Sequence, residues 1–178
     1  MSSTPSHVRS LKSKYMAGPK KSRHAAQEFG PGQREFLLCS EGEAVYYKKS
    51  WHHMTTLQAA KNIDKKRIAF VLCPAHRMKK DNVFEGEVII ENIPLNKKDQ
   101  LVRTIRNVGD RAYRADVLDR ILELLMKNDE VRVTTTENQL AKKIAKKVKA
   151  VYKTASVKYI FSRAGDLDIV RIRITFPQ

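Results

Sequence analysis

The segment that most constrains the fold runs from Thr136 to Thr154, because its apolar residues recur at the spacing of one helix face. That face consists of Leu140, Ile144, Val148 and Tyr152, supported by Ala141, Ala145 and Val151. The opposite face carries six lysines and, after Glu137, no acidic residue: Lys142, Lys143, Lys146, Lys147, Lys149 and Lys153. Thr136 can cap the first turn. The pattern predicts an amphipathic helix that must lie on a second apolar layer.

The last segment of the chain can supply that layer. Residues 156–163 and 168–176 alternate between apolar and polar positions on either side of a short turn, which predicts two paired strands. In the second of them the apolar residues face inward and the arginines face outward: Val170, Ile172 and Ile174 against Arg171 and Arg173.

A second helix is predicted over residues 96–116, where Leu101, Ile105 and Val108 share one face. Residues 116–127 can either extend this helix or form the first strand of a hairpin with residues 131–136, and the hairpin is preferred. The order is then helix, two strands, helix, two strands. It predicts an α+β layer in which a sheet is covered on one side by the lysine-faced helix.

The first half of the chain has a different composition. Residues 1–33 are rich in Ser, Pro, Gly and basic residues and contain no acidic residue before Glu28, which predicts a disordered basic arm. Short strands are expected at 35–39, 43–51, 67–74 and 83–94, with a turn at 40–43. A bulge is expected at Gly86 in the last of them. A short helix is expected at 53–65, and Thr55 or Thr56 can cap it. The chain is therefore predicted to divide into three regions, at residues 1–33, 34–94 and 95–178.

The charge of the chain points to a polyanionic partner. Its 178 residues contain 35 Lys and Arg against 19 Asp and Glu, a net charge of +16. RNA, DNA or an anionic membrane surface could balance such an excess. No apolar run has the roughly 20 residues of a membrane span, and no apolar signal segment is evident. Two widely separated cysteines favour a reducing, cytoplasmic location.

Two short motifs resemble incomplete zinc knuckles. Cys39 is followed three positions later by Gly42, and Cys73 is followed three positions later by His76. Two complete knuckles would supply the four ligands of a tetrahedral zinc site, but glycine offers no ligand. The fourth could come from Glu41, Glu43, His52 or His53, none of which has knuckle spacing. Alternatively, both cysteines are small buried residues of neighbouring strands. No metal or cofactor is therefore assigned, and the module is expected to be a degenerate zinc ribbon.

Basic residues interleaved with rings suggest contacts with RNA, in which lysines meet phosphates and rings stack on bases. The lysine-faced helix is the strongest electrostatic element, because its lysines have no acidic partners at helical spacing. The predicted nucleic-acid-binding residues are Lys20, Lys21, Arg23, Lys48, Lys49, Trp51, His52, His53, Arg77, Lys79, Lys80, Lys142, Lys143, Lys146, Lys147, Lys149, Arg171 and Arg173.

Residues 34–176 resemble, in order, small prokaryotic proteins that are similar to the N-terminal part of the nonsense-mediated-decay-type adaptor of the large ribosomal subunit. The most specific piece is TTENQLAKKI at residues 135–144. The resemblance implies a ribosome-associated, rRNA-binding protein with a zinc-knuckle module before an α/β module. This sequence has Gly42 and His76 where the family has cysteines.

The expected function is therefore rRNA binding on the ribosome, without catalysis, in ribosome stability, assembly or dormancy. Ribosomal proteins are further candidate partners, and the free protein is expected to be a monomer that does not bind membranes. Two alternatives remain open at this point. One is an RNA nuclease that uses His52, His53 and His76 for acid–base chemistry. The other is a DNA-binding regulator.

Overall fold

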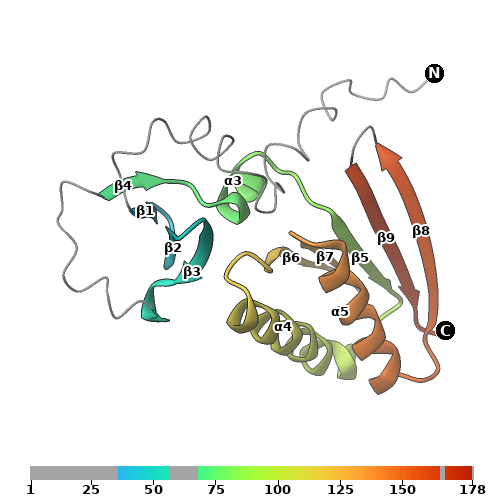
Figure 1. The fold of residues 1–178 in the computed structure, drawn as a ribbon. Helices are drawn as coiled ribbons and strands as arrows, with labels where there is room; N and C mark the ends of the chain where they lie inside the picture. The colour runs from blue at the N-terminus through green and yellow to red at the C-terminus, as the bar shows by residue number, and fades with distance from the viewer. Residues whose placement is uncertain (1–35, 57–67, 165–166, 178) are drawn as a thin grey trace.

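The computed structural model describes residues 36–56, 68–164 and 167–177, which form two sheets and three α-helices (Figure 1). The basic arm at residues 1–33 and most of the predicted helix at 53–65 lie outside the described residues. Of that helix, the structure describes one 3-10 turn, η2 (Met54–Thr56). The chain is a mixed α+β protein.

The first sheet has four short strands in the order β3-β2-β1-β4. They are β1 (Phe36–Cys39), β2 (Ala44–Tyr47), β3 (Ser50–His53) and β4 (Ile68–Val71). Strand β1 pairs antiparallel with β2 and parallel with β4. Cys39 and Cys73 are both buried beside this sheet, as the alternative interpretation of the two motifs expected.

Two sequence-based expectations for this sheet are wrong. Residues 43–51 do not form one strand, because Lys48 and Lys49 have φ values of 49° and 68° and turn the chain between β2 and β3. Two consecutive left-handed residues are what a tight hairpin turn needs. The segment after β4 also differs, since the strand ends at Val71 and Phe70 is 70% exposed rather than buried. Helix α3 (Pro74–Lys80) then begins at Pro74, where the strand at 67–74 was expected to end.

The second sheet has five strands in the order β6-β7-β5-β9-β8. They are β5 (Gly86–Glu91), β6 (Ile121–Lys127), β7 (Glu130–Thr135), β8 (Ser156–Ala164) and β9 (Leu167–Thr175). The predicted hairpins at residues 121–135 and 156–175 are confirmed, and residues 121–127 are strand rather than helix. Strand β5 lies at the centre, so the second sheet begins at Gly86 and not after Pro94.

Gly86 is not a bulge, because it pairs in register with Thr135 and Val170. Its lack of a side chain has another cause. A Cβ atom there would lie 2.3 Å from Oγ1 of Thr135 and 2.6 Å from Cβ of Ala141, so glycine allows the close approach of α5. The irregularity in this sheet lies instead in β6, between Ile121 and Glu123.

Two helices cover one face of the second sheet, as Figure 1 shows for α4 (Lys98–Ala115) and α5 (Asn138–Val151). The short 3-10 helix η5 (Leu95–Lys97) leads into α4. The predicted apolar face of α5 is confirmed, since Leu140, Ile144 and Val148 are fully buried. They pack in one core with residues of α4 and of the strands: Leu101, Ile105, Val88, Ile172 and Ile174.

The predicted cap of α5 is wrong. Thr136 is buried, and its hydroxyl accepts a hydrogen bond from the backbone N–H of Arg120 at 2.9 Å. The N-cap position is Glu137, whose side chain makes no capping hydrogen bond. Thr136 therefore joins the start of β6 to the end of β7 rather than the start of α5.

A small second core connects the two sheets. It contains Cys39, Ala44, Cys73 and Ala75 from the first half of the chain and Val117 from the segment after α4. His53 Nε2 also donates a hydrogen bond of 2.7 Å to the carbonyl oxygen of Tyr113. None of the helices in the described ranges has an apolar stretch of the length that a bilayer span requires.

Candidate nucleic-acid interface and Cys-His cluster

The lysines of α5 lie on the solvent side of the helix, because the apolar residues between them face the sheet. Lys143, Lys146, Lys147 and Lys149 are exposed and Lys142 is half-buried. No acidic residue lies between Asn138 and Val151. The structure therefore confirms the predicted segregation of charge on this helix.

The lysines nevertheless differ in their surroundings. Lys143 Nζ lies 3.6 Å from Oδ2 of Asp119, in the segment between α4 and β6. Lys149 Nζ donates to the carbonyl oxygens of Lys153 and Ala155, at 2.7 and 2.6 Å, in the turn between α5 and β8. Lys142 Nζ lies 5.8 Å from the ring centroid of Phe161 in β8. Lys146 and Lys147 make no such contact within the described part of the chain, so they are the most available to phosphate.

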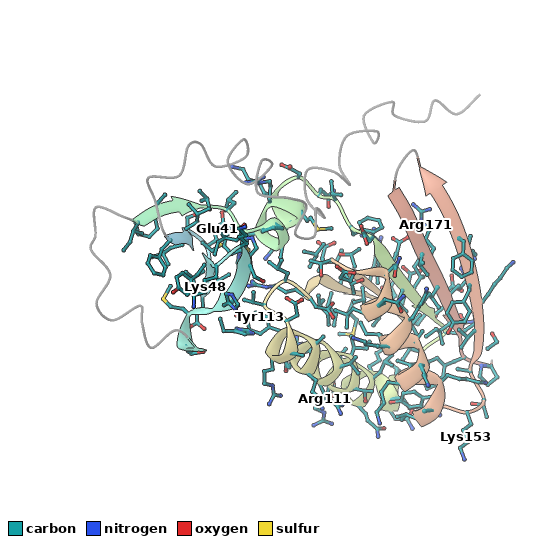
Figure 2. The ribbon with its side chains drawn as sticks, viewed as in Figure 1. Glu41, Lys48, Arg111, Tyr113, Lys153 and Arg171 are labelled. Carbon is teal, nitrogen blue, oxygen red and sulfur yellow. The ribbon has the colours of Figure 1, made fainter. Side chains whose placement is uncertain are left out.

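Helix α4 adds arginines that the sequence analysis did not include in the site. The helix carries five basic residues, Lys98, Arg103, Arg106, Arg111 and Arg114, against Asp99 and Asp110. Arg111 and Arg114 donate through Nε to backbone carbonyls one turn earlier, which orients each guanidinium along the helix. Figure 2 shows Arg111 extending outward from α4. The helical layer is therefore basic along both helices.

The face of the second sheet that no helix in the described ranges covers, called the uncovered face below, has the opposite character. Buried Glu87 accepts from Arg132 at 2.7 Å and from Arg171 at 3.0 Å, and Arg173 Nε lies 3.4 Å from Oε1 of Glu91. Arg171 and Arg173 face outward as predicted, but each has a carboxylate partner on β5. A phosphate would have to compete with that partner.

The predicted binding residues at 48–53 lie on the β2–β3 hairpin, and only those at its turn are exposed. Lys48 and Lys49 are exposed at the turn between β2 and β3. Trp51 packs against Tyr46 with ring centroids 5.5 Å apart. His52 Nε2 donates to the carbonyl oxygen of Tyr47 at 3.2 Å. The rings of this segment therefore hold the hairpin and the junction between the sheets together, and the lysines are its exposed charges.

The remaining predicted residues are divided between α3 and the N-terminal arm. Lys79 and Lys80 are exposed at the end of α3, and Arg77 is half-buried one turn earlier. Lys20, Lys21 and Arg23 lie outside the described residues. Within the described residues, four separate surfaces therefore carry the predicted basic residues: the β2–β3 turn, the end of α3, the outer face of α5 and, with Arg171 and Arg173, the uncovered face of the second sheet.

The structure does bring together Cys39, Cys73 and His76. Nδ1 of His76 lies 3.1 Å from Sγ of Cys39 and 3.3 Å from Sγ of Cys73. The backbone N–H of Cys73 also points at Sγ of Cys39, at 3.4 Å. The three potential ligand atoms all lie within 4.8 Å of one another. Burial raises the pKa of the Cys73 thiol to about 11, so this thiol keeps its proton at neutral pH.

Arg120 determines which ring nitrogen of His76 carries the proton. Nη1 of Arg120 lies 3.2 Å from Nε2 of His76, and a guanidinium can only donate. Burial and the charge of Arg120 both lower the pKa of His76, which favours the neutral ring. Nε2 of the neutral ring then accepts, and Nδ1 carries the hydrogen that points at the two sulfurs.

This arrangement does not fit a metal ion at the cluster. A metal would need the lone pair of Nδ1, and the ring proton would then move to Nε2, where it would face the N–H of Arg120. A structural zinc site also needs a fourth ligand, and position 42 offers none. A Cβ atom on Gly42 would lie 2.5 Å from Cε1 of His76, so the imidazole ring already fills the adjoining space. The donors are joined as a hydrogen-bonded cluster.

No protein-family model matches the chain, and no curated protein matches it.

Two exposed rings were missed in the sequence analysis. Tyr159 and Phe161 of β8 are 45% and 70% exposed, although they alternate along the strand as core residues do. β8 is the last strand in the order of the second sheet, so among the described strands it has a neighbour on one side only. A strand at the edge of a sheet can leave side chains exposed, and this was the available indication. Whether the rings of an edge strand are exposed depends on how far α5 extends over β8, and the periodicity of the sequence carries no information on that distance.

Proposed function

We propose that this chain is a non-enzymatic, cytoplasmic RNA-binding protein that docks on the ribosome through rRNA. In this proposal it acts in ribosome stability, assembly or dormancy by occupying an RNA site. The observation that carries the proposal is the separation of charge between the two faces of the second sheet. The uncovered face pairs its cations with carboxylates, whereas the helical face is basic and has few acidic partners.

The pairing on the uncovered face involves Glu87 with Arg132 and Arg171, and Glu91 with Arg173. On the helical face, the described residues form one ion pair, between Lys143 and Asp119. The positive charges of Lys142, Lys146 and Lys147 are therefore left to solvent and counterions. Like charges on one helix face repel one another, and a row of phosphates removes that repulsion while releasing counterions.

The ribosome enters the proposal through the resemblance of residues 34–176 described above. The fold is consistent with that resemblance only in outline, since two sheets follow one another along the chain. A basic helical layer fits rRNA by its charge, because phosphate contacts need no particular base sequence. The choice between assembly, stability and dormancy depends on which rRNA segment is bound.

Co-sedimentation with ribosomes tests the proposal. We expect the protein to travel with a ribosomal particle at moderate salt and to be released as salt is raised. Lys146→Glu with Lys147→Glu should abolish the association. The control is Lys127→Glu with Lys158→Glu, on strands β6 and β8, which changes the net charge by the same amount. This control should keep most of the association with ribosomes. The proposal is contradicted if the wild-type protein stays at the top of the gradient. It is also contradicted if the two double variants lose the association with ribosomes to the same extent.

The same preparation separates the two alternatives. A nuclease would degrade the RNA over hours and lose that activity on His52→Ala or His53→Ala. A DNA-binding regulator would prefer duplex DNA over rRNA in competition at one fixed salt concentration. We expect intact RNA and a preference for rRNA.

A further inference from the structure

Strand β8 leaves two aromatic rings exposed beside the basic helix. It is an edge strand of the five-stranded sheet and lies next to β9, as Figure 1 shows. Tyr159 pairs with Ile172, and Phe161 pairs with Val170. Both partners are buried under the helices, and residues paired directly across strands point to the same face. The two rings therefore point to the side of the sheet that α5 covers.

Helix α5 covers the beginning of this row of side chains and not its end. Val157, which precedes the two rings on the same face, packs against the main core. Tyr159 is 45% exposed and Phe161 is 70% exposed. Phe161 leaves most of its side chain in solvent and Tyr159 nearly half, so packing alone does not explain why aromatic residues stand at these positions.

The lysines of α5 run alongside the two rings. Helix α5 and strand β8 follow one another along the chain and run in opposite directions (Figure 1). Lys142 Nζ lies 5.8 Å from the centroid of Phe161. From Lys142 to Lys146 the helix advances about 6 Å, and from Phe161 back to Tyr159 the strand advances about 6.7 Å. Lys146 is thereby brought level with Tyr159, on the helix face that it shares with Lys142.

We propose that this aromatic strip, formed by Tyr159, Phe161, Lys142 and Lys146, binds an unpaired segment of RNA. One base stacks on each ring, and the two ammonium groups hold the phosphates between them. The inference rests on the RNA-binding function proposed above and specifies its substrate class as single-stranded RNA rather than a duplex.

The chemistry of the strip favours this ligand over a peptide. Flat rings beside lysines combine the two elements that bind single strands without base preference: a stacking surface and a basic track. A duplex buries its base faces in its own stack and can offer only phosphates. A peptide strand that paired with the edge of β8 would be held by main-chain hydrogen bonds and would not need aromatic rings beside lysines.

The test is a fluorescence-anisotropy titration of the full chain with a labelled uridine oligonucleotide of about twelve nucleotides and with a duplex RNA of the same length. The variants are Phe161→Ala, Phe161→Leu, Phe161→Trp and Lys146→Ala. Phe70→Ala is the matched control, because Phe70 is also 70% exposed but lies in β4 of the other sheet. Circular dichroism confirms that each variant is folded.

We expect Phe161→Ala and Phe161→Leu to weaken binding of the single strand by about tenfold to a hundredfold. Phe161→Trp should restore it, and Phe70→Ala should change it less than about twofold, within the range of an uninvolved surface position. Lys146→Ala should also reduce the slope of log affinity against log salt by about one, whereas Phe161→Ala should leave that slope unchanged.

Equal affinities for Phe161→Ala and Phe70→Ala, with wild-type protein binding RNA, overturn this inference and leave the proposed function standing. Binding of the single strand by Phe161→Leu that is as tight as binding by the wild-type protein also overturns it, because a leucine side chain offers no ring on which a base can stack. If the wild-type protein binds neither the single strand nor the duplex nor ribosomes, the proposed function itself fails.

Discussion

Nη1 of Arg120 lies 3.2 Å from Nε2 of His76, and this contact joins the segment before β6 to helix α3. The guanidinium of Arg120 is itself held by the carbonyl oxygen of Val117, at 2.6 Å from Nε, and by the ring of Tyr113, at 4.6 Å from its centroid. A residue of the second half of the chain therefore sets the proton position on a ring that lies between two cysteines of the first half.

Replacing Arg120 should change the affinity of the cluster for metal ions. In Arg120→Gln the side-chain oxygen can accept a hydrogen from Nε2, which leaves the lone pair of Nδ1 free to bind. We expect cobalt(II) to bind about tenfold or more tightly than in the wild-type protein, as seen by the thiolate-to-cobalt absorption band. Arg106→Gln, on the exposed side of α4, is the control. Equal cobalt affinities in all three proteins would show that the ring orientation does not limit binding.

A side chain at position 42 should destabilise the protein. The Cβ atom of Gly42→Ala would lie 2.5 Å from Cε1 of His76, so the ring must move away from Arg120 or the sulfurs. We expect a loss of about 1–3 kcal/mol in the free energy of unfolding, measured by urea denaturation. In His76→Ala the same substitution should cost clearly less, because the obstructing ring is gone. An equal cost in both backgrounds would contradict the close contact.

The stability should vary with pH through Asp119. Burial raises the pKa of this carboxyl group, while Lys143 lowers it and Asp116 raises it. Its Oδ1 is buried and has no hydrogen-bond partner within the part of the chain that the structure describes. The folded state therefore binds the proton more tightly than the unfolded state. The contribution of Asp119 to stability is then largest below the pKa of the unfolded chain and is lost as pH rises through the folded pKa.

Asp119→Asn isolates this effect. We expect the variant to gain stability relative to the wild-type protein as pH rises from about 4 to 7, since it lacks the carboxylate that must ionise in a buried site. Urea denaturation at a series of pH values measures the difference. Asp129→Asn is the control, because Asp129 is exposed in the turn between β6 and β7. A difference that is constant with pH would show that Asp119 does not titrate in this range.

Glu87 should stabilise the uncovered face of the second sheet without contributing to RNA binding. The carboxylate is buried and accepts from Arg132 and Arg171, which are partly exposed. Glu87→Gln removes two charge-assisted interactions, and we expect it to cost about 1–3 kcal/mol, measured by urea denaturation. The affinity for single-stranded RNA should stay within about twofold of the wild-type value, since surface changes outside an interface have small effects. A large gain in affinity would place RNA on the uncovered face.

The local elements were predictable where one period dominates the sequence. The burial of Leu140, Ile144 and Val148 and of Val170, Ile172 and Ile174 follows from periods of 3.6 and 2, because each period places its apolar residues on one face. Helix α3 could not be predicted in this way, because seven residues are too few to show a helical period. The role of Gly86 could not be predicted either. It allows a close helix–strand contact instead of forming a bulge, because of Thr135 and Ala141, which are far from it in the sequence.

The sequence by itself determined the basic charge, the lysine face of α5, the hairpin at residues 156–175 and the absence of a ligand side chain at Gly42. These features are local or compositional, so no folded partner is needed to establish them. Only the tertiary structure decided that Arg171 and Arg173 are paired with β5, that Tyr159 and Phe161 are exposed beside lysines, and that Arg120 orients His76. Each of these depends on which distant residues the sheet order and the helix packing bring within hydrogen-bond or contact distance.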